Sequence, residues 1–190
     1  MQLVFSDIHG DKKAAKSIDQ ICNGFEEVLC CGDICGYGQD FKYVIDMLKS
    51  NGVKCVLGNH DYMVIHEEMD LSDIIPCVAD PIKWTRRNIK NKEKEFLLSL
   101  PTQLETDSGI FIRHTIGLDH YVRTEDDCLG FISMTSKRTI CFGHTHKFEE
   151  YKVDGRTIVN VGSASKGRQG TNPCCVMIDK GRVIYRELGG

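Results

Sequence analysis

The sequence contains no apolar run that approaches the ~20 residues a bilayer-spanning helix needs, which argues against a membrane protein. Residues 1–7 include neither a basic region nor an apolar stretch of signal length, so we expect a cytoplasmic location. Basic residues are in no excess, because 24 Lys and Arg stand against 27 Asp and Glu, for a net charge of −3. Without a basic field, nucleic acid is an expected partner only as a small or cyclic nucleotide.

The sequence also lacks internal repeats, low-complexity tracts and a Pro/Gly/Ser-rich linker. Its 190 residues, 41% hydrophobic and 27% charged, are typical of a soluble globular domain with one core. We therefore predict a single domain over residues 1–190, in which about 63–100 form a helical flank.

Cysteine is plentiful, with ten residues, but none is arranged in the CxxC pairing of a structural zinc site. Most cysteines lie inside apolar runs, such as residues 28–31 and 174–178. We interpret them as buried, reduced thiols rather than as disulfides. Cys31 and Cys35 lie near Asp33, which leaves a metal or redox role open for these two.

The first sixty residues alternate between apolar segments and helical patterns. Strands are predicted over residues 2–6, 26–31 and 53–57. The first helix between them begins after Asp11, which can act as an N-cap, and ends at Gly24, and the second helix ends at Asn51-Gly52. This β-loop-α order is typical of parallel sheets, although periodicity alone supports only an α/β or α+β fold.

The second half is richer in strands. They are predicted over residues 109–113 and 137–142, and again as short segments within 148–188. Turns at 154–155 and 180–181 join those last segments. Two sheets packed face to face and flanked by helices suit this order, with parallel units first and more antiparallel strands last.

Five short segments carry residues of the types that bind metal ions. They are Asp7-Ile8-His9, Gly32-Asp33, Gly58-Asn59-His60-Asp61, His114 and Gly143-His144-Thr145-His146. Most follow predicted strands, and strand ends can meet at one rim of a sheet. Together the segments supply three carboxylates, one carboxamide and five imidazoles, which is enough for two adjacent metal ions.

Four of the five segments, each taken alone, also have a purely structural explanation. Asp7 could cap a helix, and the glycines around Asp33 could simply make a sharp turn. Asn59 could belong to a turn, and His114 could be a hydrogen-bonded core histidine. The combination is more specific, because five of the seven histidines fall in these segments. Two buried carboxylates without cations would also repel each other, so we favour a dinuclear metal site.

The ordered set of motifs resembles the calcineurin-like metallophosphoesterases, and the resemblance runs from Gln2 to about Gly167. Within that superfamily the chain looks closest to the small, single-domain bacterial and archaeal phosphodiesterases. The resemblance implies a four-layer αββα sandwich, with two mixed sheets flanked by helices and a dinuclear metal site at the sheet rim.

The resemblance also implies two divalent transition metal ions, with manganese or iron favoured over zinc, cobalt or nickel. The ligands of the first ion would be Asp7, His9, Asp33 and His146. Asp33 would bridge to the second ion, which Asn59, His114 and His144 would complete. In the family pattern His60 would contact the phosphate and assist the leaving group, while Asp61 would orient the ring of His60.

Two positions depart from the family pattern. Thr115 follows His114 where glycine is usual, and Asn160-Val161-Gly162-Ser163 stands where the family has Asn-Pro-Gly-Ser. The first change affects the path of a loop, and the second affects the wall of the site.

The activity that the resemblance implies is hydrolysis of a small phosphodiester by a metal-bridging hydroxide, with His60 assisting. Asp61 stands where the protein serine/threonine phosphatases of the superfamily have Glu, and the Gly-Asp loop lacks their Arg. A phosphomonoesterase and a dinucleoside polyphosphate hydrolase are alternatives on the same site, and a non-catalytic scaffold of the same fold is another. Nothing supplies the basic groove of a repair nuclease.

Four basic residues near the motifs could bind a substrate phosphate or could simply be solvated. They are Arg113, Lys147, Lys166 and Arg168. We interpret all four as solvated surface.

Overall fold

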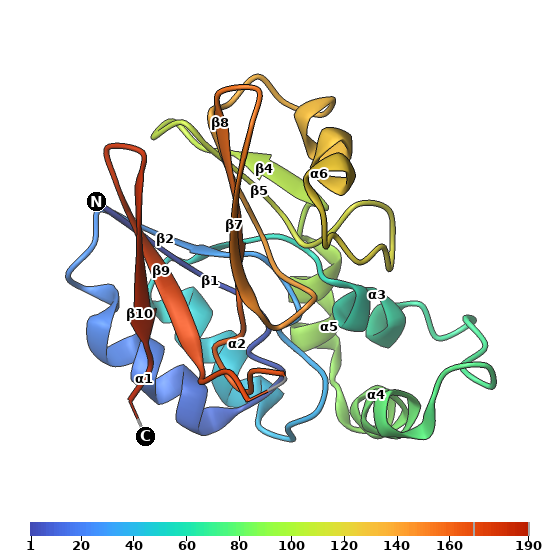
Figure 1. The fold of residues 1–190 in the computed structure, drawn as a ribbon. Helices are drawn as coiled ribbons and strands as arrows, with labels where there is room; N and C mark the ends of the chain where they lie inside the picture. The colour runs from blue at the N-terminus through green and yellow to red at the C-terminus, as the bar shows by residue number, and fades with distance from the viewer. Residues whose placement is uncertain (169, 190) are drawn as a thin grey trace.

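The structure, a computed structural model, describes residues 1–168 and 170–189 and contains two five-stranded mixed sheets (Figure 1). The first sheet has the order β10-β9-β1-β2-β3. Its strands are β1 (Gln2–Phe5), β2 (Glu27–Cys30), β3 (Lys54–Cys55), β9 (Cys174–Asp179) and β10 (Arg182–Glu187). The second sheet has the order β4-β5-β6-β8-β7. Its strands are β4 (Gln103–Glu105), β5 (Ile110–Arg113), β6 (Thr139–Phe142), β7 (Phe148–Val153) and β8 (Arg156–Val161).

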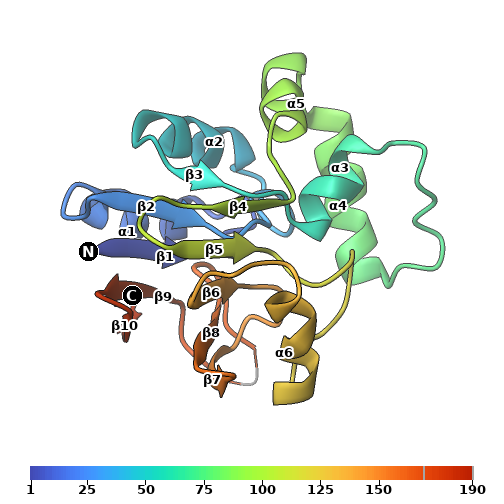
Figure 2. The ribbon, with the colours of Figure 1, turned by 90° about the horizontal axis from the view of Figure 1, so that it is seen from above.

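The two sheets pack face to face, and helices cover their outer faces. The helices are α1 (Lys12–Cys22), α2 (Phe41–Ser50), α3 (Asn59–Ile65), α4 (Pro76–Asn88), α5 (Asn91–Leu98) and α6 (Glu125–Ile132). Figures 1 and 2 both place α1 and α2 on one side of the molecule and α6 on the opposite side. The expected α/β sandwich of two mixed sheets flanked by helices is thus confirmed.

Side-chain alternation explains why the central strands read as continuous apolar runs. In β1, Val4 faces the core between the sheets, while Leu3 and Phe5 face the helices. In β6, Cys141 joins the core between the sheets, while Ile140 and Phe142 face α6. Successive side chains point to opposite faces of a strand, so a strand in a middle layer must be apolar on both.

Parallel pairing at the centre of each sheet points several strand ends the same way. In the first sheet β1, β2 and β3 are parallel, and in the second β5, β6 and β8 are parallel. The antiparallel strands of the last third divide between the sheets, because β7 pairs with β8 while the β9–β10 hairpin pairs with β1. The chain therefore returns to its first sheet at the end.

The segment expected to be helical over about 63–100 contains the end of α3, all of α4 and α5, and one long loop. Residues 66–75, between α3 and α4, contain no helix and extend from the edge of the molecule in both overall views (Figures 1 and 2). Arg86 on α4 fixes the start of this loop, since its guanidinium donates to the carbonyls of Met63 and His66, each at 2.7 Å. Two elements were not predicted, β4 and α6.

None of the helices in the described residues is long and apolar enough to cross a bilayer.

The cysteines are free thiols, and nine of the ten are buried, as expected from their apolar context. Burial raises the pKa of Cys22 to about 11 and that of Cys141 to about 12, which suppresses the reactive thiolate at neutral pH. Cys77, on α4, is the exposed one.

We therefore predict that the native protein alkylates rapidly at Cys77 alone. Peptide mass mapping after brief iodoacetamide treatment at pH 7.5 checks this, with a sample unfolded in guanidinium as the control that exposes all ten thiols. A second thiol that reacts as fast as Cys77 in the native protein would contradict the assignment.

Candidate metal centre

The nine residues predicted to form the site lie together at one rim of the two sheets. Asp7 follows β1 and Asp33 follows β2, while Asn59 opens α3 after β3. His114 follows β5, and the Gly-His-Thr-His segment follows β6. All nine are at most 9% exposed. The polar residues that follow the parallel strands of both sheets therefore lie together in one buried site, as the sequence predicted.

Five of these residues have a backbone conformation that amino acids other than glycine rarely adopt. The residues are Asp7, His9, Asp33, His144 and His146, with φ between +48° and +73°. Outside the site, the described chain has only two more non-glycine residues of this kind, Asp154 and Lys180 in hairpin turns. The left-handed region costs about 1–2 kcal/mol per residue, so the surrounding fold holds these side chains inward against strain.

Two glycines allow the strand ends to approach the carboxylates. A Cβ atom on Gly58 would overlap the Asp33 carboxylate, and one on Gly143 would overlap the Ser6 hydroxyl and the Asp7 carboxylate. Only glycine fits at these two positions.

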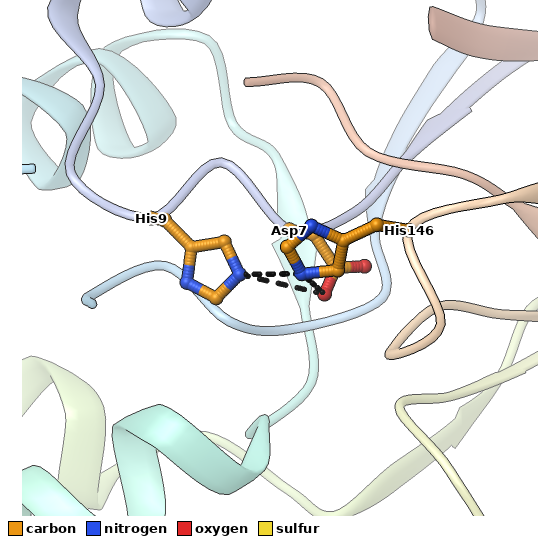
Figure 3. Close-up of side chains that lie close together, drawn as sticks. All are labelled: Asp7, His9 and His146. Carbon is orange, nitrogen blue, oxygen red and sulfur yellow. Dashed lines mark hydrogen bonds and ion pairs between the residues drawn. The ribbon is translucent and has the colours of Figure 1, made fainter. Parts of the chain in front are cut away.

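Asp7, His9 and His146 converge on one point (Figure 3). The Nε2 atoms of His9 and His146 are 2.9 Å apart, and Asp7 Oδ1 is 3.2 Å from His146 Nε2. Each ring turns its Nδ1 to a backbone carbonyl, that of Cys35 for His9 and that of Lys166 for His146. A carbonyl only accepts, so each Nδ1 carries a proton, and in the neutral form of each ring Nε2 presents a lone pair. Two lone pairs and a carboxylate then face one another.

A second group of ligand atoms adjoins the first around Asp33. His114 Nδ1 donates to the carbonyl of Cys31 over 2.8 Å, which directs Nε2 toward Asn59 Oδ1 at 3.0 Å and Asp33 Oδ2 at 3.4 Å. His144 Nδ1 lies 3.1 Å from the same Asn59 oxygen. Cys31 and Cys35 therefore contribute to the site through their backbone carbonyls, which orient His114 and His9.

The arrangement fits divalent cations by the chemistry of its donors. Among the described residues, Asp7 Oδ1 and His60 Nδ1 are buried and have no hydrogen-bond partner, and His144 Nε2 faces only the carboxylate of Asp119, at 3.1 Å. Hydrogen-bond acceptors that face one another repel unless a cation or a proton lies among them. The imidazole orientation by backbone carbonyls is also the usual support of a metal-ligating histidine. The candidate ligands form three overlapping groups, and Asp7, His9 and Asp33 each belong to two of them. One group places His60 beside His9 and Asp33.

The pKa values show the same crowding of charge. Burial alone would raise the pKa of Asp7, but His146 and His9 outweigh burial and hold it well below its ordinary value. Burial opposes charge on His114 too, yet Asp33 raises the His114 pKa to about 9. Protons on imidazoles thus balance the carboxylates in the protein alone, at positions where cations would do the same.

His60 differs from the other imidazoles, because burial lowers its pKa to about 3 and keeps the ring neutral. Its backbone N–H donates to Asp33 Oδ1 over 2.9 Å.

The role expected for Asp61 needs correction. Its carboxylate accepts from the backbone N–H groups of Ile34, Cys35 and Gly58, at 2.8 to 3.1 Å, and makes no hydrogen bond to the ring of His60. As the third residue of α3, Asp61 is placed to bind N–H groups at the helix start and in the neighbouring loop. It therefore positions the loop that carries Asp33.

Arg168 also differs from the expectation of solvated surface. It is half-buried, and its guanidinium donates to the hydroxyls of Tyr121 at 3.1 Å and Tyr37 at 3.5 Å. Lys147, in contrast, forms a surface ion pair with Glu149. The signal that could have singled out Arg168 is absent locally, because both tyrosines are distant in sequence.

The two departures from the family pattern leave the site intact. Asn160 donates to the Gly143 carbonyl and to Thr145, and the Ser163 hydroxyl donates to the Asp7 carbonyl. Val161 therefore replaces the usual proline without disturbing these contacts. Thr115 donates to the His120 carbonyl and closes the loop after His114. This loop brings Asp119, which the sequence did not indicate, to 3.1 Å from His144 Nε2.

The fold and the cluster define an α/β sandwich protein with a candidate metal centre at the sheet rim. The family model of the calcineurin-like phosphoesterase superfamily domain matches residues 1–181, and the chain belongs to this superfamily.

A protein of Methanocaldococcus jannaschii, the uncharacterized protein MJ0912, is 36% identical over 108 residues. The match covers 55% of this chain and 44% of that protein, so the chain spans less than half the length of this curated relative.

Among solved structures, a metallophosphoesterase from Sphaerobacter thermophilus has a TM-score of 0.79 at 21% identity, over 98% of this chain and 87% of that one. A putative diadenosine tetraphosphatase has a TM-score of 0.66 at 19% identity, over 98% and 92%. Vps29 of Chaetomium thermophilum has a TM-score of 0.56 at 18% identity, over 94% and 82%. At these identities the likeness concerns the fold.

We predict that Mn²⁺ stabilises the metal-free protein against heat. A ligand at a hundred times its Kd adds about 2.7 kcal/mol, or roughly 5–10 °C for a chain of this size. Differential scanning fluorimetry before and after chelation measures the shift. Asp33→Asn should abolish most of it, whereas His120→Gln, at an exposed histidine outside the cluster, should keep it. A full shift in Asp33→Asn would refute the ligand assignment.

Proposed function

We propose that the protein is a metal-dependent phosphoesterase and that it prefers small phosphodiesters. The observation that carries the proposal is the pair of facing imidazole nitrogens, His9 Nε2 and His146 Nε2, 2.9 Å apart beside the Asp7 carboxylate. Such a pair is unfavourable in the protein alone and favourable around a cation.

Two ions would be held by the predicted ligand set. It comprises Asp7, His9, Asp33, Asn59, His114, His144 and His146. The mixed oxygen and nitrogen donors suit manganese or iron and also accept zinc, cobalt or nickel. When bound, such ions supply Lewis-acid polarisation of phosphate oxygens and lower the pKa of water.

His60 is placed to assist at the phosphate. Its ring is neutral and lines the cavity beside the ligand cluster, and its Nδ1 has no hydrogen-bond partner in the described part of the chain. A neutral imidazole carries one N–H group, which can donate to a phosphate oxygen or to the departing ester oxygen. Asp61, bound to three backbone N–H groups, fixes the start of the helix that carries His60.

Two cavities beside the cluster support the preference for a diester. A cavity of about 290 Å³ contains His60 and Asn59 in its wall, and a second of about 790 Å³ contains His9 and Lys12. Both share Tyr37, His146 and Arg168, so they meet at the ligand cluster. A phosphodiester has two arms to place, and a monoester has one.

The competing proposals use the same fold. A dinucleoside polyphosphate hydrolase finds support in the likeness to the putative diadenosine tetraphosphatase. A non-catalytic scaffold would not need a cluster of buried nitrogen and oxygen atoms suited to bind metal, and we favour it less. We further propose a cytoplasmic location and a small-molecule substrate.

We predict that His60→Asn lowers kcat by about a hundredfold or more, as expected for loss of a positioned proton donor, without loss of bound metal. Steady-state kinetics with bis(p-nitrophenyl) phosphate, together with elemental analysis of the variant, separates the two effects. His66→Gln, at the other end of α3, is the matched control and should behave as the parent protein. If His60→Asn loses metal, His60 is a ligand and not a substrate contact.

We predict a higher kcat/KM for bis(p-nitrophenyl) phosphate than for p-nitrophenyl phosphate in Mn²⁺. Both esters release the same chromophore, so one absorbance assay compares them, and a chelated sample is the blank. Exclusive cleavage of the monoester would replace the diesterase proposal with a monoesterase. Faster cleavage of diadenosine tetraphosphate than of either ester would favour the polyphosphate hydrolase.

A further inference from the structure

Six apolar side chains line the smaller cavity beside the cluster, and we call this set the apolar wall. The apolar wall consists of Met63, Met69, Ile74, Ile75, Val78 and Leu118. Most of it comes from the 66–75 loop and the helices on either side of that loop. Arg86 holds the beginning of the loop through its bonds to the Met63, His66 and Met69 carbonyls, so the wall is a built part of the fold.

Exposed apolar surface is concentrated at this cavity. Seven large hydrophobic side chains are exposed in the described part of the chain, and three of them line this one cavity. They are Tyr37, Ile75 and Leu118, at 39%, 63% and 44% exposure. Apolar side chains gathered at a concave, polar-floored site indicate a ligand that covers them.

The cavity size limits what the wall can cover. Its volume of about 290 Å³ is roughly twice that of the ~150 Å³ cavity that accommodates benzene. One phosphate group and one aromatic ring system fill such a space. The two methionines of the wall suit an aromatic ring, because thioether sulfur makes favourable contacts with ring edges.

Acidic residues on the same cavity restrict the charge of the ring. Besides Asp33, the carboxylates of Asp73 and Asp119 line it. They disfavour a second anionic group on the aromatic arm. An uncharged ring is therefore the better match.

Arg168 provides a fixed positive charge in the lining that the two cavities share. Its guanidinium joins the hydroxyls of Tyr37 and Tyr121. The Tyr37 ring lies against His9 and His60, with centroids 4.6 and 5.1 Å away, and the Tyr121 ring lies 4.4 Å from that of His144. The Tyr37–Arg168–Tyr121 bridge thus crosses between the two halves of the ligand cluster. A planar guanidinium in that position matches a phosphate oxygen.

We propose that this site selects phosphoesters whose leaving group is an uncharged aromatic alcohol, with the ring on the apolar wall and a phosphate oxygen on Arg168. The inference rests on the proposed function, because it names the substrate class of the same site. In the reaction, water forms a new P–O bond and the P–O bond to the aromatic alcohol breaks. One water proton ends on that alcohol and the other is released to solvent.

Binding of non-hydrolysable phosphonates to the Mn²⁺-loaded protein tests the wall without turnover. We expect phenylphosphonate to bind at least about tenfold more tightly than methylphosphonate by calorimetry, since the ring covers exposed apolar surface. 4-Carboxyphenylphosphonate should bind more weakly than phenylphosphonate, because Asp73 and Asp119 repel its second charge.

Variants at exposed positions separate the wall from general stability. Ile75→Ser and Leu118→Ser should reduce the phenyl-to-methyl ratio severalfold. Leu98→Ser and Leu129→Ser, at exposed leucines that do not line the cavity, should leave it unchanged. Arg168→Gln should weaken both phosphonates by about tenfold at an unchanged ratio. Its matched control is Arg123→Gln, since Arg123 packs on the Tyr121 ring, 5.0 Å from its centroid, without lining this cavity.

The outcomes separate this inference from the proposed function. Equal affinity for phenyl- and methylphosphonate, or an unchanged ratio in Ile75→Ser, overturns the inference even if the protein hydrolyses diesters. A phenyl preference that Ile75→Ser removes, in a protein that cleaves no ester, supports the wall and overturns the proposed hydrolysis. Unaltered phosphonate affinity in Arg168→Gln overturns the role of Arg168.

Discussion

The structure depends on holding together, in one buried place, ligand atoms that repel one another unless a cation or a proton lies among them. His9 Nε2 and His146 Nε2 face each other beside Asp7, and His114 Nε2 faces Asn59 and Asp33. The Nδ1 atom of each of these three imidazoles is bonded to a backbone carbonyl, so rotation of the ring would lose a hydrogen bond. Much of the loop structure around the sheet rim serves to fix these orientations, and cations or protons relieve the resulting repulsion.

The rest of the fold supplies the rigidity that this crowding requires. The left-handed backbone at five site residues is strained. The strain persists because the strands that precede these residues, β1, β2 and β6, lie in the middle layers of a four-layer structure. Ser163 and Ser165 hold the Asp7 carbonyl, and Asn160 holds the turn that carries His144 and His146. The last third of the chain, which contributes no candidate ligand after His146, therefore stabilises the site from outside.

Much of the sandwich and the nine site positions could be predicted from the sequence, because buried strands read as apolar runs and polar motifs follow them directly. The prediction failed where tertiary contacts decide. The 66–75 loop has no local signal for its path, which Arg86 fixes from the next helix. The family pattern assigns Asp61 to the ring of His60, but the backbone N–H groups of Ile34, Cys35 and Gly58 bind its carboxylate instead. Arg168 meets partners 131 and 47 residues away, which no local pattern reveals.

Gly58 and Gly143 have a consequence for how this protein can vary. Since any side chain at either position would displace Asp33 or Asp7, a change there damages the centre while every coordinating residue keeps its identity. Inventories of intact ligands would then misjudge such a variant as competent. In protein engineering and in the interpretation of natural diversity, each of these glycines and its facing carboxylate behave as one inherited unit.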